Sequence, residues 1–214
     1  MKARIEITLG LSYLSACIGL CLTLPACANP QAQAAQALKQ QLAAKRADQI
    51  QSMKAYTRAL AAMDKGDTTN AKKHLNQAIA QDNDNAHAWM ALGRLEYDQD
   101  NLHKAAKAFD HAARLSPLRY EPHYNLGIVL ESAGNYTQAI HQYQIALKHA
   151  PHQIHIKENL ARCYLKTNAN TSTRHAKQLI SQALTTESRP QWIQWLKQKE
   201  RQLGLCGDAE AARR

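Results

Sequence analysis

The sequence predicts an all-α protein, a solenoid of antiparallel helix pairs that ends in a capping helix. Three observations predict this fold class. Ala, Gln, Leu and Lys are abundant and only 6% of the residues are aromatic, a composition that favours helices over sheets. One pattern of residues occurs twice at a spacing of 34. Each copy closes with a Pro, which ends a helix because it lacks an N–H and disfavours helix in the residue before it.

The repeated pattern occupies residues 86–153. Its first copy has Trp89, Leu92, Gly93, Ala105, Phe109, Ala112 and Pro117, and its second has His123, Leu126, Gly127, Ala139, Tyr143, Ala146 and Pro151. A period of about 34 residues with this pattern indicates helix–turn–helix units that stack on one another. The segment resembles the tetratricopeptide-repeat (TPR) family, although His123 stands where that family usually has a bulky apolar residue. The resemblance implies partner binding and no reaction.

Residues 1–28 have the features of an export signal. Lys2 and Arg4 form a short basic start, and an uncharged, mostly apolar run follows from Leu9 to Leu24. Leu24–Cys27 resembles a bacterial lipobox, in which the Cys is acylated and becomes the first mature residue. Cys17 ends a second lipobox-like run, which we reject because cleavage there would leave an apolar start to the mature protein.

Two other fates of this segment remain open. Ala26–Ala28 fits the small-x-small rule of a secretory cleavage site, and Leu9–Ala28 is, at roughly 20 uncharged residues, long enough for an uncleaved anchor. All three fates place the body of the protein outside the cytoplasm. Because Ala28 and not Asp follows Cys27, the lipoprotein resemblance implies the periplasmic face of the outer membrane. A soluble periplasmic protein and an inner-membrane-anchored protein are the alternatives.

Residues 29–51 form an Ala- and Gln-rich segment, which we expect to be a helical linker from about Gln33. Its large apolar residues are Leu38, Leu42 and Ile50. Such a thin apolar stripe either packs lightly on the first repeat or belongs to a spacer that lifts the solenoid off a membrane.

Residues 52–187 are expected to form the solenoid. A step of 34 residues divides them into repeats at about 52–85, 86–119, 120–153 and 154–187. The first repeat is degraded, because Arg58 takes the place of Leu92, and Gly66 is expected in its turn. In the clear repeats we place Trp89 in the core, where its truncation to Ala should cost about 3–5 kcal/mol. Gly93 is expected where the second helix crosses too closely for a side chain.

The C-terminal part should complete and cap the stack. In the fourth repeat a loop is expected at Asn168–Thr173, after which the core stripe resumes three residues late. That stripe consists of Ala176, Ile180 and Ala183. Residues 188–204 are predicted to be a capping helix that begins at Pro190, and residues 205–214 a frayed tail. The apolar residues available to cover the stack are Trp192, Ile193, Leu196 and Leu203.

The sequence contains no catalytic or cofactor-binding motif. A nucleophile elbow, a phosphate-binding Gly loop, an HExxH helix and a CxxC pair are all absent, so we predict a non-enzyme without cofactor, metal or small-molecule substrate. His149, His152 and His155 are closely spaced, but Pro151 interrupts the helix between them. Cys163 is expected to be a buried thiol; a disulfide to Cys206 is the alternative.

The TPR resemblance implies a concave groove lined by the first helix of each repeat. Carried over by register, the lining residues are Tyr56, Leu60, His87, Met90, Arg94, Tyr97, Glu121, Tyr124, Ile128, Glu131, Glu158, Arg162 and Leu165. Tyr, Met and Arg are enriched in the cores of protein interfaces. The predicted function is therefore an envelope scaffold that binds a protein or peptide partner, with no nucleic acid expected.

Among TPR proteins, the chain resembles the small exported lipoproteins of the type IV pilus system, which help the outer-membrane secretin assemble. Two other functions remain open. One is an inner-membrane-anchored assembly or quality-control factor. The other is a cationic binder of anionic lipid or polymer, which the net charge of +10 permits.

Overall fold

A computed structural model describes residues 29–167, 170–186 and 190–202, and the regular structure of these residues is entirely α-helical. The expected export signal with Cys27, the capping residue Leu203, Cys206 and the C-terminal tail lie outside the described residues. The chain divides into two compact units, Met1–Ala47 and Asp48–Arg214.

In the first unit, the described residues belong to helix α2 (Pro30–Asp64), which continues into the second unit. The helix begins three residues before the predicted start and contains the expected linker except for its first residue, Asn29. The side chains of residues 30–47 are all exposed, including those of Leu38 and Leu42. Although α2 is 35 residues long, neither it nor any other helix in the described ranges has the long apolar stretch that crossing a bilayer requires.

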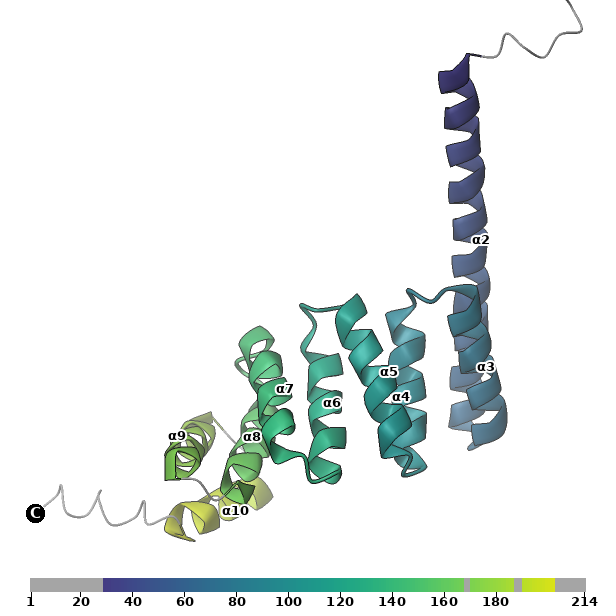
Figure 1. The fold of residues 1–214 in the computed structure, drawn as a ribbon. Coiled ribbons are helices and arrows are strands. Elements are labelled where there is room, and N and C mark those ends of the chain that lie inside the picture. Colours follow the sequence, from purple (N-terminus) through teal and green to yellow (C-terminus); the bar gives the residue numbers. More distant parts are fainter. Residues whose placement is uncertain (1–28, 168–169, 187–189, 203–214) are drawn as a thin grey trace, which may run out of the picture. The chain divides into compact units, whose positions relative to one another are not determined.

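The second unit is a stack of helix pairs in which neighbouring helices pack side by side (Figure 1). After α2 come α3 (Thr68–Gln81), α4 (Ala86–Asp98), α5 (Leu102–Leu115), α6 (Tyr120–Ser132), α7 (Tyr136–His149), α8 (Ile154–Lys166), α9 (Asn170–Thr186) and α10 (Pro190–Gln202). Helices α4, α6 and α8 begin 34 residues apart, and so do α3, α5, α7 and α9. The period in the sequence is therefore a period of the structure.

The turns within the first three pairs follow the same period. Gly66, Asp100 and Gly134 have φ values of 73°, 59° and 77°, in the left-handed region that favours Gly. Asp is one of the few other residues that adopt this conformation readily. Helices α5 and α7 end two residues before Pro117 and Pro151, as the sequence predicts.

Small residues allow the helices of a pair to approach closely. Two positions of the second helices α3, α5 and α7, which recur with the 34-residue period, hold Ala residues that are 0% exposed. These are Ala71, Ala78, Ala105, Ala112, Ala139 and Ala146. A Cβ atom at Gly93 would lie 2.7 Å from Cδ1 of Phe109, and one at Gly127 would lie 2.5 Å from Cε1 of Tyr143. The expected close crossing at Gly93 is thus confirmed, and the atoms that approach it are those of an aromatic ring.

The prediction that Trp89 lies in the core is wrong. It is half-buried, its Nε1 donates a hydrogen bond of 3.0 Å to the carbonyl oxygen of Asn83, and its ring centroid lies 4.3 Å from that of His111. At the equivalent position, His123 is half-buried and Nδ1 lies 2.8 Å from Oε1 of Gln142. This register position covers the edge of a helix pair, which explains why it accepts a polar ring.

The fourth pair differs from the prediction at one point. Residues 170–173 are the first turn of α9 and not a loop, so the three additional residues lengthen that helix to 17 residues, against 14 in α3, α5 and α7. The predicted stripe of Ala176, Ile180 and Ala183 is buried. Leu196 of α10 is 0% exposed in the same cluster, so α10 caps the stack as expected.

Candidate partner-binding groove

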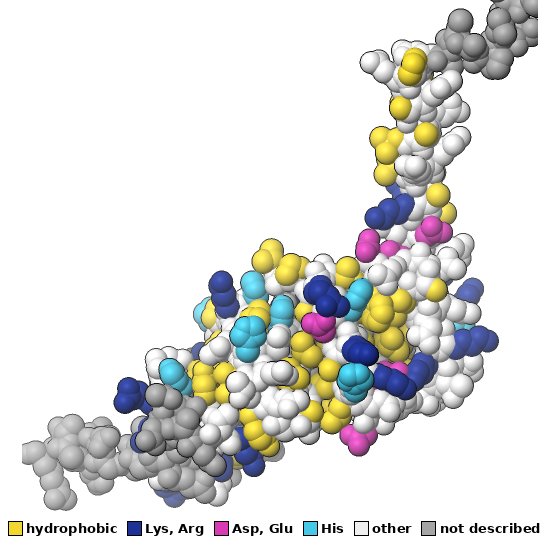
Figure 2. Space-filling view, in the orientation of Figure 1, with side chains coloured by type: hydrophobic (Ala, Val, Ile, Leu, Met, Phe, Trp, Pro, Cys, Tyr) yellow, Lys and Arg dark blue, Asp and Glu magenta, His cyan; other side chains and the backbone are white. Residues whose placement is uncertain are grey.

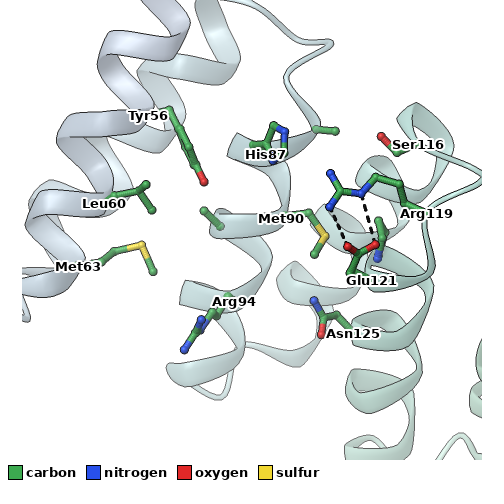
Figure 3. A pocket seen from close by; sticks show the side chains of 13 residues that line it. Tyr56, Leu60, Met63, His87, Met90, Arg94, Ser116, Arg119, Glu121 and Asn125 are labelled. Atoms are coloured by element: carbon green, nitrogen blue, oxygen red, sulfur yellow. Dashed lines mark hydrogen bonds and ion pairs between the residues drawn. The ribbon is translucent and has the colours of Figure 1, made fainter. Parts of the chain in front are cut away.

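The predicted groove residues lie on α2, α4, α6 and α8, at positions that recur with the 34-residue period. A hollow of about 300 Å³ lies between α2, α4 and the start of α6 (Figure 3). Six predicted residues line it: Tyr56, Leu60, His87, Met90, Arg94 and Glu121. Register did not identify the seven other lining residues: Met63, Ala86, Ala91, Ser116, Arg119, Pro122 and Asn125. Met63 and Asn125 lie one turn from predicted residues, whereas Arg119 belongs to the loop before α6.

The floor of this hollow is apolar and adaptable. Tyr56, Leu60 and Met63 project from α2 toward α4, which contributes Met90 (Figure 3). Leu60 is 37% exposed, so its apolar side chain is accessible to a partner. Methionine side chains are flexible and polarizable, so two of them in one hollow can adjust to apolar groups of different shape.

The rim of the hollow carries one neutralised ion pair and one uncompensated cation. Arg119 donates to Glu121 through Nη2 at 2.8 Å and Nε at 3.3 Å. This bond holds the pKa of the Glu121 carboxyl below its ordinary value and that of the Arg119 guanidinium above its own. Arg94 is exposed, and no hydrogen bond or ion pair joins it to any described residue. The rim is therefore electropositive at Arg94.

A second hollow of about 270 Å³ continues along α4 and α6. It shares Arg94 and Asn125 with the first hollow and adds Tyr97 and Ile128 of the predicted set. The Tyr97 hydroxyl lies 3.1 Å from Oγ of Ser132, which anchors the ring against α6. We call the two hollows together the α2–α6 groove. It is a continuous surface formed by three successive first helices.

The next predicted residues form a bonded network between α6 and α8. Glu131 accepts hydrogen bonds from the Tyr143 hydroxyl at 2.9 Å and from Nη2 of Arg162 at 3.0 Å. Asn159 donates to the Tyr124 hydroxyl at 3.3 Å. The bond to Glu131 raises the pKa of Arg162, and burial raises the pKa of Tyr124. These side chains join neighbouring repeats and stiffen the groove.

Glu158 does not lie on the groove surface, contrary to expectation. Its side chain is 1% exposed, whereas Met90 and Tyr124, at the equivalent positions of the preceding repeats, are half-buried. The last repeat encloses this position, because its first helix is almost continuously buried from Glu158 to Tyr164.

Arg162 and the last predicted residue, Leu165, line a third hollow of about 520 Å³ between α8 and α10. Its other lining residues are Lys166, Trp195 and Lys199. The two residues of α10 could not be predicted from the sequence, in which this helix has only the pattern of a cap. In the described parts of the chain, no three His, Cys, Asp or Glu side chains lie close enough together to hold a metal ion.

The fold and the groove define a helical-repeat scaffold with an interaction surface on its first helices. Family models described as "Tetratricopeptide repeat" match residues 56–119 and residues 120–153. The chain is a tetratricopeptide-repeat protein. A search of curated protein sequences finds no match.

Solved structures with the same fold include three of particular interest. MamA is 22% identical, with a TM-score of 0.59 over 63% of this chain and 77% of that chain. YrrB, described as "a TPR protein with an unusual peptide-binding site", is 16% identical, with a TM-score of 0.57 over 62% and 67%. The O-GlcNAc transferase of Thermobaculum terrenum, as a K341M mutant, is 24% identical, with a TM-score of 0.55 over 64% and 26%. At these identities the likeness is one of fold.

Proposed function

We propose that this protein is a non-catalytic scaffold that holds a peptide segment of a protein partner in the α2–α6 groove. The observation that carries the proposal is the combination of an apolar, methionine-containing hollow with the uncompensated guanidinium of Arg94 on its rim. Groups of this kind dominate the energetics of protein interfaces. The solved structure of YrrB, whose description names a peptide-binding site, supports peptide binding on this fold.

Each part of the groove suits a different part of a peptide. A large apolar side chain would fill the hollow between Leu60, Met63 and Met90. The amide of Asn125 offers both a donor and an acceptor, which matches a peptide backbone. Arg94 would bind a carboxylate of the peptide by paired hydrogen bonds.

A comparison of two variants tests the groove. Met90→Ala combined with Arg94→Ala truncates one side chain of the apolar floor and removes the free cation, and should lose partners that the wild-type chain retains from envelope extract. Lys104→Ala combined with Leu118→Ala is the matched control, because both residues are exposed and neither lines the groove. Equal retention of the same partners by the groove variant and the wild type would contradict the proposal.

We further propose that the scaffold works in the bacterial envelope, tethered through a lipid on Cys27. The lipobox-like run before Cys27 and the basic, apolar start of the chain support this location. On the resemblance described above, the partner would belong to an envelope assembly such as the type IV pilus secretin. Labelled palmitate should be incorporated into the wild-type chain and not into Cys27→Ser. Retention of label by Cys27→Ser would exclude this site of acylation.

An inner-membrane-anchored assembly or quality-control factor is the second candidate for the location. The uncharged run of Leu9–Ala28 favours it. Globomycin, which blocks processing of lipoproteins, separates the two candidates. An unprocessed precursor should accumulate only if the chain is a lipoprotein, whereas an uncleaved anchor is indifferent to the drug.

A further inference from the structure

The positive charge of the chain is distributed unevenly along the solenoid. Residues 48–153 carry eleven basic and eleven acidic side chains, whereas residues 154–202 carry nine basic and three acidic ones. Residues 48–153 are thus formally neutral, whereas residues 154–202, the last repeat with its cap, have a net charge of +6. Over α9 and α10, the face seen in Figure 2 shows Lys and Arg side chains among the coloured atoms.

This charge surrounds the hollow between α8 and α10. Arg162 and Lys166 reach it from α8, and Lys199 and Trp195 reach it from α10. Glu131 balances Arg162, but Lys166 is exposed and forms no ion pair with the side chains that the structure describes. The half-buried Trp195 gives the hollow an apolar wall. A volume of about 520 Å³ is large enough for side chains of a bound segment.

The hollow lies on the same face as the α2–α6 groove. Arg94, Ile128 and Arg162 follow one another at 34-residue intervals on α4, α6 and α8. Arg94 and Ile128 line the groove, and Arg162 lines the α8–α10 hollow. A segment that leaves the groove toward the C-terminal end of the stack therefore meets the basic hollow next.

Building on the proposed function, we infer that the partner segment has two parts and binds in one direction. Its apolar part occupies the hollow between α2 and α4, and a cluster of Asp and Glu residues lies against Arg162, Lys166 and Lys199. The charge of the last repeat is complementary to such a cluster, and electrostatic complementarity fixes the orientation of a bound segment. An acidic protein segment fits better than a lipid surface, because the basic side chains line a hollow that continues the groove.

The test selects peptides from a phage-displayed library of random 16-residue sequences, with the full chain in mild detergent as the bait. Enriched peptides should combine a large apolar residue with a cluster of Asp or Glu residues. The cluster should lie on the same side of the apolar residue, N-terminal or C-terminal, in all of them. The best peptide should bind Lys166→Glu/Lys199→Glu about tenfold more weakly, with a reduced dependence on salt. Lys104→Glu/Lys107→Glu on α5 is the matched charge reversal and should change its affinity less than about twofold.

The outcomes separate this inference from the proposed function. Peptides that bind the groove without acidic residues, or that are indifferent to the Lys166 and Lys199 reversals, overturn the inference and leave the scaffold proposal standing. If Met90→Ala weakens the binding of none of the enriched peptides, the proposal that the groove binds the partner is wrong. A third outcome is that no acidic peptide is enriched, while the full chain binds phosphatidylglycerol vesicles and the Lys166 and Lys199 reversals abolish this binding. That outcome would overturn the inference and assign the hollow to a lipid surface. Circular dichroism spectra show whether the variants fold. If the double variant does not fold, the single variant Lys166→Glu replaces it in the binding measurements.

Discussion

Replacement of Gly127 by Ala tests the packing of the helix pairs most directly. The new Cβ atom would lie 2.5 Å from Cε1 and 2.7 Å from Cδ1 of Tyr143, well inside van der Waals contact. The Tyr143 ring cannot move away easily, because it is 0% exposed and its hydroxyl donates a 2.9 Å hydrogen bond to Glu131. We therefore expect a large destabilisation from the addition of one methyl group.

The magnitude follows from three contributions. Overpacking of a filled core costs about 1–3 kcal/mol. A shift of the ring that breaks the bond to Glu131 adds about 1.5–3 kcal/mol, as for hydrogen bonds to charged groups. Ala gains about 0.5–1 kcal/mol over Gly in a helix interior. The free energy of unfolding of Gly127→Ala should thus fall by about 1.5–5.5 kcal/mol.

Gly93→Ala is the matched comparison. Its Cβ atom would lie 2.7 Å from the Phe109 ring, which has no hydroxyl to hold it, so the ring can shift. The expected loss is about 1–2 kcal/mol. Urea unfolding of both variants, followed by circular dichroism at 222 nm, measures the two losses under the same conditions.

The other repeats suggest a rescue. Where the first helix has Ala59 or Ala161 at this position, the second helix has an aliphatic residue, Leu75 or Ile180, in the same core cluster. Tyr143→Leu should therefore recover part of the stability that Gly127→Ala loses. The reasoning fails if Gly127→Ala is as stable as the wild type, if Gly93→Ala is the more damaging change, or if Tyr143→Leu brings no recovery.

Three further predictions concern single side chains. Trp89→Ala should reduce the free energy of unfolding by about 2–3 kcal/mol, less than for a fully buried Trp, because the ring is half-buried; a loss of 5 kcal/mol in urea unfolding would contradict this. Burial raises the pKa of the Cys163 thiol to about 12, so iodoacetamide at pH 8 should label it only as fast as the chain unfolds, once the other Cys residues are changed to Ser. Rapid labelling would show an open site. The Glu121 carboxyl has a lowered pKa, so its bond to Arg119 stabilises the fold above the unfolded pKa, and this contribution is lost as pH falls through the folded pKa. In an NMR titration, Arg119→Gln should raise the pKa of Glu121, and an unchanged value would refute the role of the pair.

Much of the fold could be predicted because the residues that pack the two helices of a repeat together lie close to one another in the sequence. Gly93, Phe109 and Pro117 belong to one helix pair, and their spacing alone specifies a close crossing and the end of a helix. The prediction failed where residues added in the fourth repeat could form either loop or helix. Asn170–Thr186 became a longer helix, since an additional turn extends an existing helix without a new loop.

The candidate groove was only partly predictable. Register alone placed Met90 and Arg94 correctly on an accessible face, because a helix with a known packed stripe presents its opposite side. Register could not show which accessible side chains are already bonded to one another. Arg162 and Glu131 are 31 residues apart in the sequence, and their bond depends on how two repeats stack.

The sequence by itself thus determined the all-α repeat, its period and the face that each first helix turns away from its partner, because these depend on contacts within about 34 residues. Only the tertiary structure decided that Glu158 is enclosed, that Glu131 and Arg162 hold each other, and that Lys166 and Lys199 border one hollow. These features arise where side chains from separate helices meet, and the angle and distance between the helices are set by the packing of the whole stack.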